Sequence, residues 1–146
     1  MIDAYAAGLI DGEGTISLMK TRTSDTYRSP TVSISSTTIE MLEFMKSHFG
    51  GSIVNHKTYQ EHHKPTFNWV VKYDRAIEVI KHVYSYLLEP RKKARANYIL
   101  LHYKKLTKRN GKYTNRNHKA KMLFEKGFFH PSTPSVNKLR KVPISL

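Results

Sequence analysis

The stretch that decides the fold is Ala6-Ala7-Gly8-Leu9-Ile10-Asp11-Gly12-Glu13-Gly14, near the start of the 146-residue chain. We expect a short helix from Asp3, whose carboxylate can accept first-turn N–H groups, to about Asp11, with Gly12 and Gly14 ending it. A glycine inside a helix costs about 1 kcal/mol relative to alanine. A turn after the helix would explain the last two glycines but not Gly8, so Gly8 needs another reason.

Small residues recur on one face of this predicted helix. Ala4, Gly8 and Gly12 are spaced four residues apart, and we place Ala7 on the same side. A helix face with almost no side chains lets a second helix approach its backbone closely. The stretch therefore predicts a helix–helix contact.

Strand pairs and helices alternate downstream. Polar and apolar residues alternate in the predicted strands, whereas apolar residues recur three and four apart in the predicted helices. The expected order is strand 15–20, strand 31–35, a helix capped by the Thr37–Glu40 box and ending at 49, strand 52–59, strand 66–73, helix 74–88 and helix 90–106. This order predicts an α+β fold in which helices cover one face of a single antiparallel sheet.

The other face of the predicted sheet is polar. Alternation places these residues opposite the apolar set: Thr15, Ser17, Thr31, Ser33, Ser35, Asn68 and Lys72. Such a face is most often simply solvated, but beside a basic segment it can also serve as a platform for nucleic acid.

Positive charge is concentrated in the last third of the chain. The formal net charge is +14, and residues 1–88 contribute nothing to it because they hold nine basic and nine acidic residues. Residues 89–146 hold sixteen basic residues against Glu89 and Glu125. A field of this size favours a polyanionic partner. We expect residues 1–107 to form one core domain and 108–146 a basic extension that packs on the core or contacts DNA.

Composition excludes several classes of protein. There is no cysteine, which removes Cys-ligated zinc, thiol catalysis and a disulfide-built fold. No apolar stretch approaches the ~20 residues that cross a bilayer, and the start lacks a signal peptide. We therefore expect no membrane partner and an intracellular protein, cytoplasmic in a prokaryote or phage host or made inside an organelle. His56, His62 and His63 lack metal-binding spacing of the HExxH kind.

The stretch at 6–14 resembles the signature of the LAGLIDADG homing endonucleases, from which it differs at Ala6, Gly12 and Glu13. The predicted order of elements over about residues 3–106 is also that of the family. The resemblance implies a saddle-shaped, four-stranded antiparallel sheet. It also implies a site-specific endonuclease that cleaves both strands of a long pseudo-palindromic DNA target by metal-dependent phosphodiester hydrolysis.

The resemblance assigns roles to particular residues. Glu13 corresponds to the acid that binds a divalent metal, and the carbonyl of Gly12 also faces it, so both are expected ligands of Mg²⁺ or Mn²⁺. In the segment 88–97, the Ala96-Asn97 pair places Lys92 at the catalytic lysine, with Lys93 as the alternative. Such a cation can stabilise charge at the scissile phosphate. The alternative is that Arg91, Lys92 and Lys93 only contact phosphates and take no part in catalysis.

The resemblance also implies a homodimer, because the chain has one motif and no internal repeat. Two copies would pair on a two-fold axis and bring their Glu13 side chains together. The expected interface consists of Ala4, Ala7, Gly8, Asp11 and Gly12.

The expected DNA contacts form two groups. Base-reading contacts are expected from Lys20, Arg22, Arg28, Thr31, Ser33, Ser35, Asn55, Lys57, Asn68 and Lys72. Phosphate contacts are expected from Lys93, Lys104, Lys105, Lys108 and Arg109. Strict alternation puts Lys20, Asn55 and Lys57 on the apolar side, so they join the first group only if a bulge or strand end reorients them.

Two other functions stay open. A catalytically inactive protein on the same fold, either an RNA maturase that binds intron RNA or a DNA-binding regulator, would have little need of an acid at Glu13. A basic protein that merely coats nucleic acid would show steep salt dependence without sequence preference.

Overall fold

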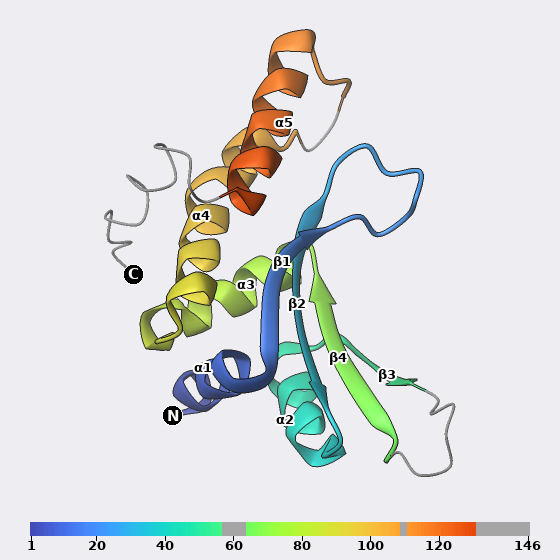
Figure 1. The fold of residues 1–146 in the computed structure, drawn as a ribbon, viewed down its shortest axis with the longest axis vertical. Helices are drawn as coiled ribbons and strands as arrows, with labels where there is room; N and C mark the ends of the chain where they lie inside the picture. Colours follow the sequence, from blue (N-terminus) through green and yellow to red (C-terminus); the bar gives the residue numbers. More distant parts are fainter. Residues whose placement is uncertain (57–63, 109–110, 131–146) are drawn as a thin grey trace.

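The fold is described by a computed structural model that places residues 1–56, 64–108 and 111–130. The elements are α1 (Ile2–Glu13), β1 (Gly14–Met19), β2 (Ser29–Ser36), α2 (Ile39–Phe49), β3 (Ser52–His56), β4 (Thr66–Lys72), α3 (Asp74–Val83), the 3₁₀ turn η1 (Tyr84–Tyr86), α4 (Pro90–Leu106) and α5 (Asn115–Phe129). The predicted α+β order is confirmed, and α5 extends it (Figure 1). None of the helices in the described ranges could span a membrane.

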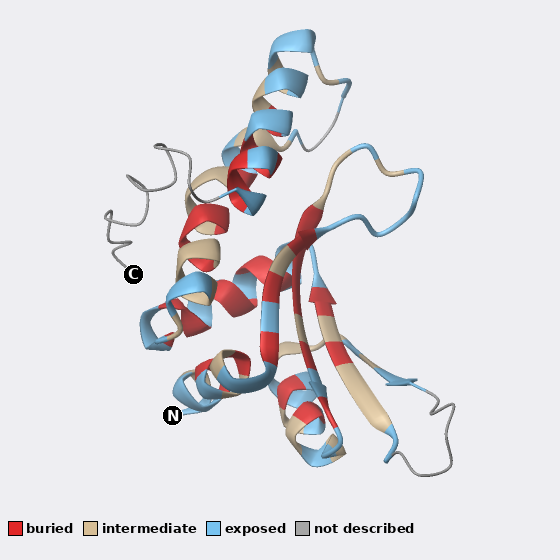
Figure 2. Ribbon diagram, in the orientation of Figure 1, coloured by how far each residue is buried: buried red, intermediate tan, exposed pale blue. Residues whose placement is uncertain are grey.

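The four strands form one antiparallel sheet in the order β1-β2-β4-β3. Its register lines up Ile16, Val32 and Val71 in one row across the sheet, all of them buried (Figure 2). Ile34 and Trp69 form the next row, and the indole Nε1 of Trp69 donates to the carbonyl of Gly50 at 2.8 Å. The predicted alternation therefore gives the correct core face, against which the helices pack.

Helix α5 packs on α4 through aromatic side chains. The rings of Tyr98 and Phe124 stack with centroids 5.1 Å apart, and the Tyr98 hydroxyl donates to the carbonyl of Phe124 at 2.9 Å. Phe128 is buried as well. Helix α5 is not among the elements expected from the sequence, and it lies within the segment expected to be a basic extension.

Four expected helix ends are wrong. The helix expected over 74–88 ends at Val83, where the 3₁₀ turn η1 follows. Helix α1 continues through Gly12 to Glu13, and Gly14 begins β1 without an intervening loop. Asp3 does not cap α1, because its carboxylate lies 3.2 Å from Nδ1 of His82 on α3. The box at Thr37–Glu40 does not form either: α2 is preceded by Thr38, whose side chain makes no capping bond.

Gly14 makes the direct passage from helix to strand possible. Its N–H donates to the carbonyl of Ile10, and a Cβ at this position would lie 2.7 Å from the Cα of Ile10. The contact would be with the backbone of Ile10, which cannot move aside as a flexible side chain could. The end of α1 is therefore fixed directly against the first strand.

Helix α5 also buries a charged side chain, Lys121, which is 1% exposed. Its ammonium lies 4.1 Å from the ring centroid of Tyr103 and hydrogen-bonds the hydroxyl of Thr107. Burial lowers the pKa of Lys121 to about 8, and the nearby Glu125 opposes this shift only in part.

We expect the free energy of unfolding to rise by about 1–2 kcal/mol between about pH 7.5 and about pH 9.5. The pKa of Lys121 is about 8 in the folded chain, so in that window the folded chain loses a proton that the unfolded chain still binds. Stability therefore increases with pH. Urea unfolding across this range tests the effect, and Lys121→Met should remove the rise; an unchanged slope in that variant would contradict the assignment.

Candidate functional site

The end of α1 and the start of α4 are tied together by side chains that bond each other's backbone. The Lys92 ammonium donates to the carbonyls of Ile10 and Asp11 at 2.8 and 2.7 Å. The Asp11 carboxylate accepts from the N–H groups of Leu88 and Glu89 at 2.9 and 3.2 Å. Carbonyls at a helix end carry partial negative charge and lack partners within the helix, so a cation satisfies them well. We call this set of four hydrogen bonds the α1–α4 junction.

Helix α4 is started by Glu89 and Pro90. The Glu89 carboxylate accepts from the N–H groups of Lys92 and Arg91 at 2.7 and 3.2 Å, and these bonds lower its pKa. Pro90 occupies the first helical position, where the missing N–H is no loss. This cap sets the start of α4 so that the Lys92 side chain reaches back to α1.

Glu13, the last residue of α1, is exposed two residues beyond Asp11. A hollow of about 310 Å³ lies nearby, between residues 14–16 of β1 and the first turns of α4. Arg91, Lys92 and Arg95 line it, and an Arg95 guanidinium nitrogen donates to the carbonyl of Ile16 at 3.1 Å. Glu89 lines the hollow as well, and Glu13 itself does not, but the residue after Glu13, Gly14, does. An exposed acid therefore immediately precedes a mainly basic hollow that suits a phosphate group.

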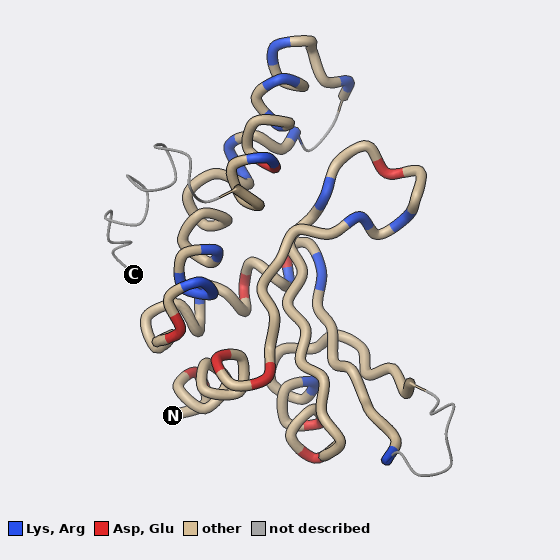
Figure 3. The backbone as a smooth tube through the Cα atoms, viewed as in Figure 1, with Lys and Arg blue, Asp and Glu red and all other residues tan. Residues whose placement is uncertain are grey.

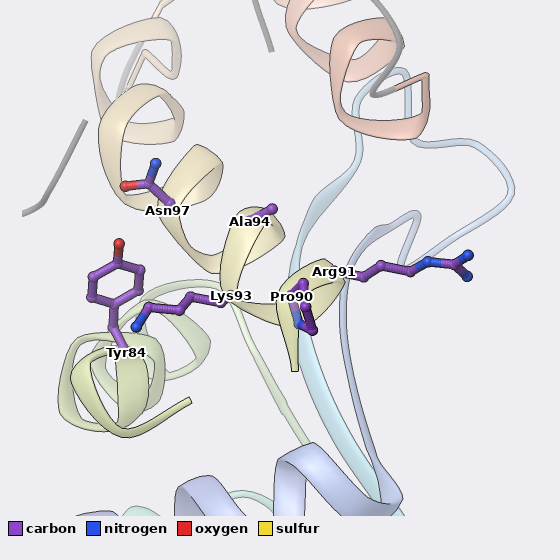
Figure 4. A pocket seen from close by; sticks show the side chains of 6 residues that line it. All are labelled: Tyr84, Pro90, Arg91, Lys93, Ala94 and Asn97. Atoms are coloured by element: carbon purple, nitrogen blue, oxygen red, sulfur yellow. The ribbon is translucent and has the colours of Figure 1, made fainter. Parts of the chain in front are cut away.

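The two candidate lysines point in different directions. Lys93 extends away from the sheet toward Tyr84, in the direction opposite to Arg91, and its ammonium lies 5.5 Å from the Tyr84 ring centroid (Figure 4). Lys92 lies on the carbonyls that precede Gly12. The structure therefore brings Lys92, and not Lys93, to the end of α1.

The outer face of α1 is bare of side chains. Ala4, Gly8 and Gly12 are exposed, and a Cβ at either glycine would meet nothing within 4 Å. The placement of Ala7 on this face is wrong: it is fully buried, because α1 turns the side that carries Ala7 and Ile10 toward the core. The carboxylate of Asp11 belongs to the α1–α4 junction.

An apolar hollow of about 420 Å³ lies beside the start of α1. Met1, Ile2 and Tyr5 line one side of it, and Met41 and Phe44 of α2 line the other. The ring centroids of Tyr5 and Phe44 are 4.8 Å apart, edge to face. This surface is continuous with α1, and sequence periodicity did not mark it because its residues come from two helices.

The register places Ser33, Ser35, Asn68 and Lys72 on the sheet face opposite the core. Ser35 Oγ donates to Asn68 Oδ1 at 3.0 Å. Thr31 shares that face but is only 5% exposed, and its hydroxyl donates to the carbonyl of Ser29, so its expected contact with bases is wrong.

Other expected DNA contacts are distributed around the sheet. Lys20 is exposed just beyond β1, and Asn55 is exposed on the face that carries Phe67. Three apolar residues on the polar face break the predicted pattern: Met19, Val54 and Val70. Lys57 and Arg109 lie outside the described residues.

Basic residues gather at the end of the molecule formed by the β1–β2 loop, α4 and α5 (Figure 3). Lys104, Lys105 and Lys108 are exposed there at the end of α4. Arg22 is exposed in the loop, whereas the guanidinium of Arg28 lies 4.9 Å from the ring centroid of Phe129 on α5. Arg28 is therefore engaged within the chain.

Comparison with known proteins identifies the fold. Neither a protein-family model nor a curated protein sequence matches the chain. Among solved structures, the archaeal intron-encoded homing endonuclease I-Vdi141I, complexed with DNA, matches at a TM-score of 0.56 and 18% identity, over 94% of this chain and 91% of that one. Homing endonuclease I-CvuI, in complex with its target, matches at a TM-score of 0.62 and 15% identity, over 95% of this chain and 90% of that one.

A third match extends the comparison to a longer protein. The meganuclease I-SmaMI, bound to DNA, matches at a TM-score of 0.62 and 14% identity, over 90% of this chain but only 45% of its own. The LAGLIDADG meganuclease I-CpaMI matches as well. The chain thus has the fold of the LAGLIDADG homing endonucleases, with residues 6–14 on α1 and at the start of β1.

We expect Lys92→Met to lower the free energy of unfolding by about 1–3 kcal/mol, because two carbonyls lose a charged donor. Lys93→Met is the matched control: it makes the same chemical change one residue along and removes a cation–π contact worth about 0.5–1 kcal/mol. Urea denaturation measures both. Equal losses in the two variants would show that the α1–α4 junction contributes no special stability.

Proposed function

We propose that the chain is a LAGLIDADG homing endonuclease. It acts as a homodimer and cleaves both strands of a long pseudo-palindromic DNA target by divalent-metal-dependent hydrolysis. The observation that carries this proposal is the position of Glu13: an exposed acid at the end of a helix whose outer face is bare, directly before Gly14, which lines a mainly basic hollow. The fold shared with homing endonucleases complexed with DNA supports it.

One chain offers few ligands for a divalent metal, and a second copy would supply the same ligands again. Within the described residues, no cluster of three or more acidic, histidine or cysteine side chains could hold a metal. One chain offers the Glu13 carboxylate and the Gly12 carbonyl, since the Asp11 carboxylate is taken up by two backbone N–H groups. These are hard oxygen ligands of the kind that Mg²⁺ and Mn²⁺ prefer. A bound Mg²⁺ would supply Lewis-acid stabilisation of charge at the scissile phosphate.

The bare face of α1 supports pairing of two copies. Among the described residues, nothing lies within 4 Å of a Cβ at Gly8 or Gly12, whereas each glycine weakens the helix by about 1 kcal/mol. Close approach of a second α1 would account for both. The lengths of the matched proteins agree with this, since the chain covers most of I-CvuI but less than half of I-SmaMI, a chain long enough for two such units.

Lys92 would act on the phosphate while it holds α1. An ammonium group has three donors, and two of them lie on the carbonyls of Ile10 and Asp11. The third is left for the phosphate, where a fixed cation stabilises the charge that develops during cleavage. Arg91 and Arg95, in the same hollow, would hold neighbouring phosphates.

The proposed target lies along the polar face of the sheet. Ser33, Ser35, Asn68 and Lys72 present hydrogen-bonding groups there, while the exposed lysines at the end of α4 would contact phosphates. Short polar side chains on a sheet can read base edges in the major groove.

We expect Glu13→Gln to abolish cleavage and to leave DNA affinity within a few-fold of the wild type. The substitution keeps the shape of the side chain but removes the charge that would bind metal. Cleavage of DNA bearing the candidate target, with and without Mg²⁺, measures the effect. Cleavage by the variant at the wild-type rate would show that Glu13 is not a metal ligand. Binding by the wild-type protein without any cleavage would instead favour a maturase or regulator.

We expect Gly8→Leu to prevent dimerisation while each copy keeps its fold. A Cβ at this position meets nothing within 4 Å among the described residues, so the fold should accept the substitution, but the leucine side chain would hold two α1 helices apart. Sedimentation reports the oligomeric state, and circular dichroism controls for folding. A folded, DNA-cleaving dimer of this variant would remove Gly8 from the interface.

A further inference from the structure

The loop between β1 and β2, residues 20–28, is held by α5 at its second half. The N–H of Arg28 donates to Oε1 of Glu125 at 2.7 Å, and the Tyr27 hydroxyl lies 2.7 Å from Nδ1 of His118. The loop leaves the sheet at the end of the molecule where α5 lies (Figure 1). Nearly a hundred residues of sequence separate the partners, so these are tertiary contacts and not local turns.

Aromatic and cationic contacts strengthen this attachment. The rings of Tyr27 and Tyr113 have centroids 4.6 Å apart, and Arg28 extends its guanidinium over Phe129. The first half of the loop is held separately, because the Tyr73 hydroxyl donates to Oγ1 of Thr21 at 2.8 Å. Only the short turn between these two points has no partner among the rest of the described chain, and it closes on itself through bonds between Arg22 and Asp25.

Glu125 is an unusual residue to find at this position. It is the only acid after Glu89, in a segment rich in lysine and arginine, and it is only 7% exposed. One of its oxygens binds the loop, while Oε2 has no partner within the described residues. The nearby Lys121, on the same helix, carries the opposite charge, and removing one member of a buried charge pair is destabilising. Among the described residues, however, the hydrogen bond to the carboxylate comes from the loop and not from Lys121, so Glu125 also has a positioning role.

We propose that α5 clamps the β1–β2 loop, with Glu125 as the positioning residue, and that this clamp sets base preference in the outer part of the DNA target. The inference rests on the proposed function, since it concerns how the same protein reads DNA. Arg28 serves the clamp, and the exposed Lys20 and Arg22 are left to face the target. A loop that is ordered before binding loses less conformational freedom and presents its side chains in one register.

The first experiment tests the clamp without DNA. Hydrogen exchange of the Arg28 amide is compared in full-length wild type, Glu125→Leu, Glu125→Gln and Met122→Ala. Leucine removes the acceptor, so exchange should be about tenfold faster, whereas glutamine keeps an acceptor oxygen and should preserve protection. Met122, exposed on the same helix, is the control and should change nothing. Unchanged exchange in Glu125→Leu would overturn the clamp.

The second experiment tests base preference by binding-site selection with the same four proteins. Glu125→Leu should lower the preference at outer target positions by about tenfold and keep it at central positions. A uniform loss of affinity with every base preference intact would overturn the proposal, since the clamp would then be structural only. Should Glu125→Leu fail to fold, Tyr27→Phe removes the bond to His118 at an exposed place and should produce the same outer loss, to a smaller degree.

The two readouts separate this inference from the function on which it rests. A wild-type protein that selects no DNA sequence would overturn both the proposed function and the role of the clamp in reading DNA. The exchange of the Arg28 amide would then still decide whether the clamp itself exists.

Discussion

The exchange of hydrogen bonds between the end of α1 and the start of α4 is the constraint on which the rest of the structure depends. A cation from α4 satisfies carbonyls at the end of α1, and an anion from α1 satisfies the N–H groups that lead into α4. Each charge is opposite in sign to the partial charge of the backbone group it meets, so the contact stabilises both helices. Gly14 then begins β1 directly after α1, with no loop between the helix and the strand. Glu13 lies between the α1–α4 junction and Gly14, so the position of its backbone is fixed on both sides.

A single helix serves the core and the outer surface of the protein at once. The side of α1 with Ala6, Ala7 and Ile10 packs inside the chain, and its small residues let the helix lie close to the sheet. Its opposite side carries the exposed glycines, where a second copy could approach. Helical stability lost at those glycines is offset by packing on the core, because tertiary contacts contribute most of the stability of a helix in a folded protein.

Much of this structure follows from local patterns that sequence analysis can detect. Alternation gave the correct faces of β1, β2 and β4, because one side of the sheet is buried and a shift of one residue would expose the core. The motif located Glu13 and the bare helix face. The bonds of Lys92 to the end of α1, the burial of Lys121 and the contact of Glu125 with the β1–β2 loop could not be predicted, since each depends on how separate elements pack together. Ala7 lies on the other side of α1 from the one expected, and Thr31 lies on the expected face but is covered, because spacing and alternation do not say which neighbouring element covers a face.

The central claim is that two copies of the end of α1 hold divalent metal against DNA, and metal-directed cutting tests it most directly. Fe²⁺ replaces Mg²⁺ on the complex of the protein with its selected target. Added hydrogen peroxide oxidises the bound Fe²⁺ to Fe³⁺ and yields hydroxide and a hydroxyl radical that cuts nearby nucleotides, and ascorbate reduces the iron again. The account predicts cuts on both strands, confined to the centre of the target and related by its two-fold symmetry, with none above background when Glu13 is replaced by Gln. Cuts spread along the DNA, or the same central cuts in the variant, would contradict it.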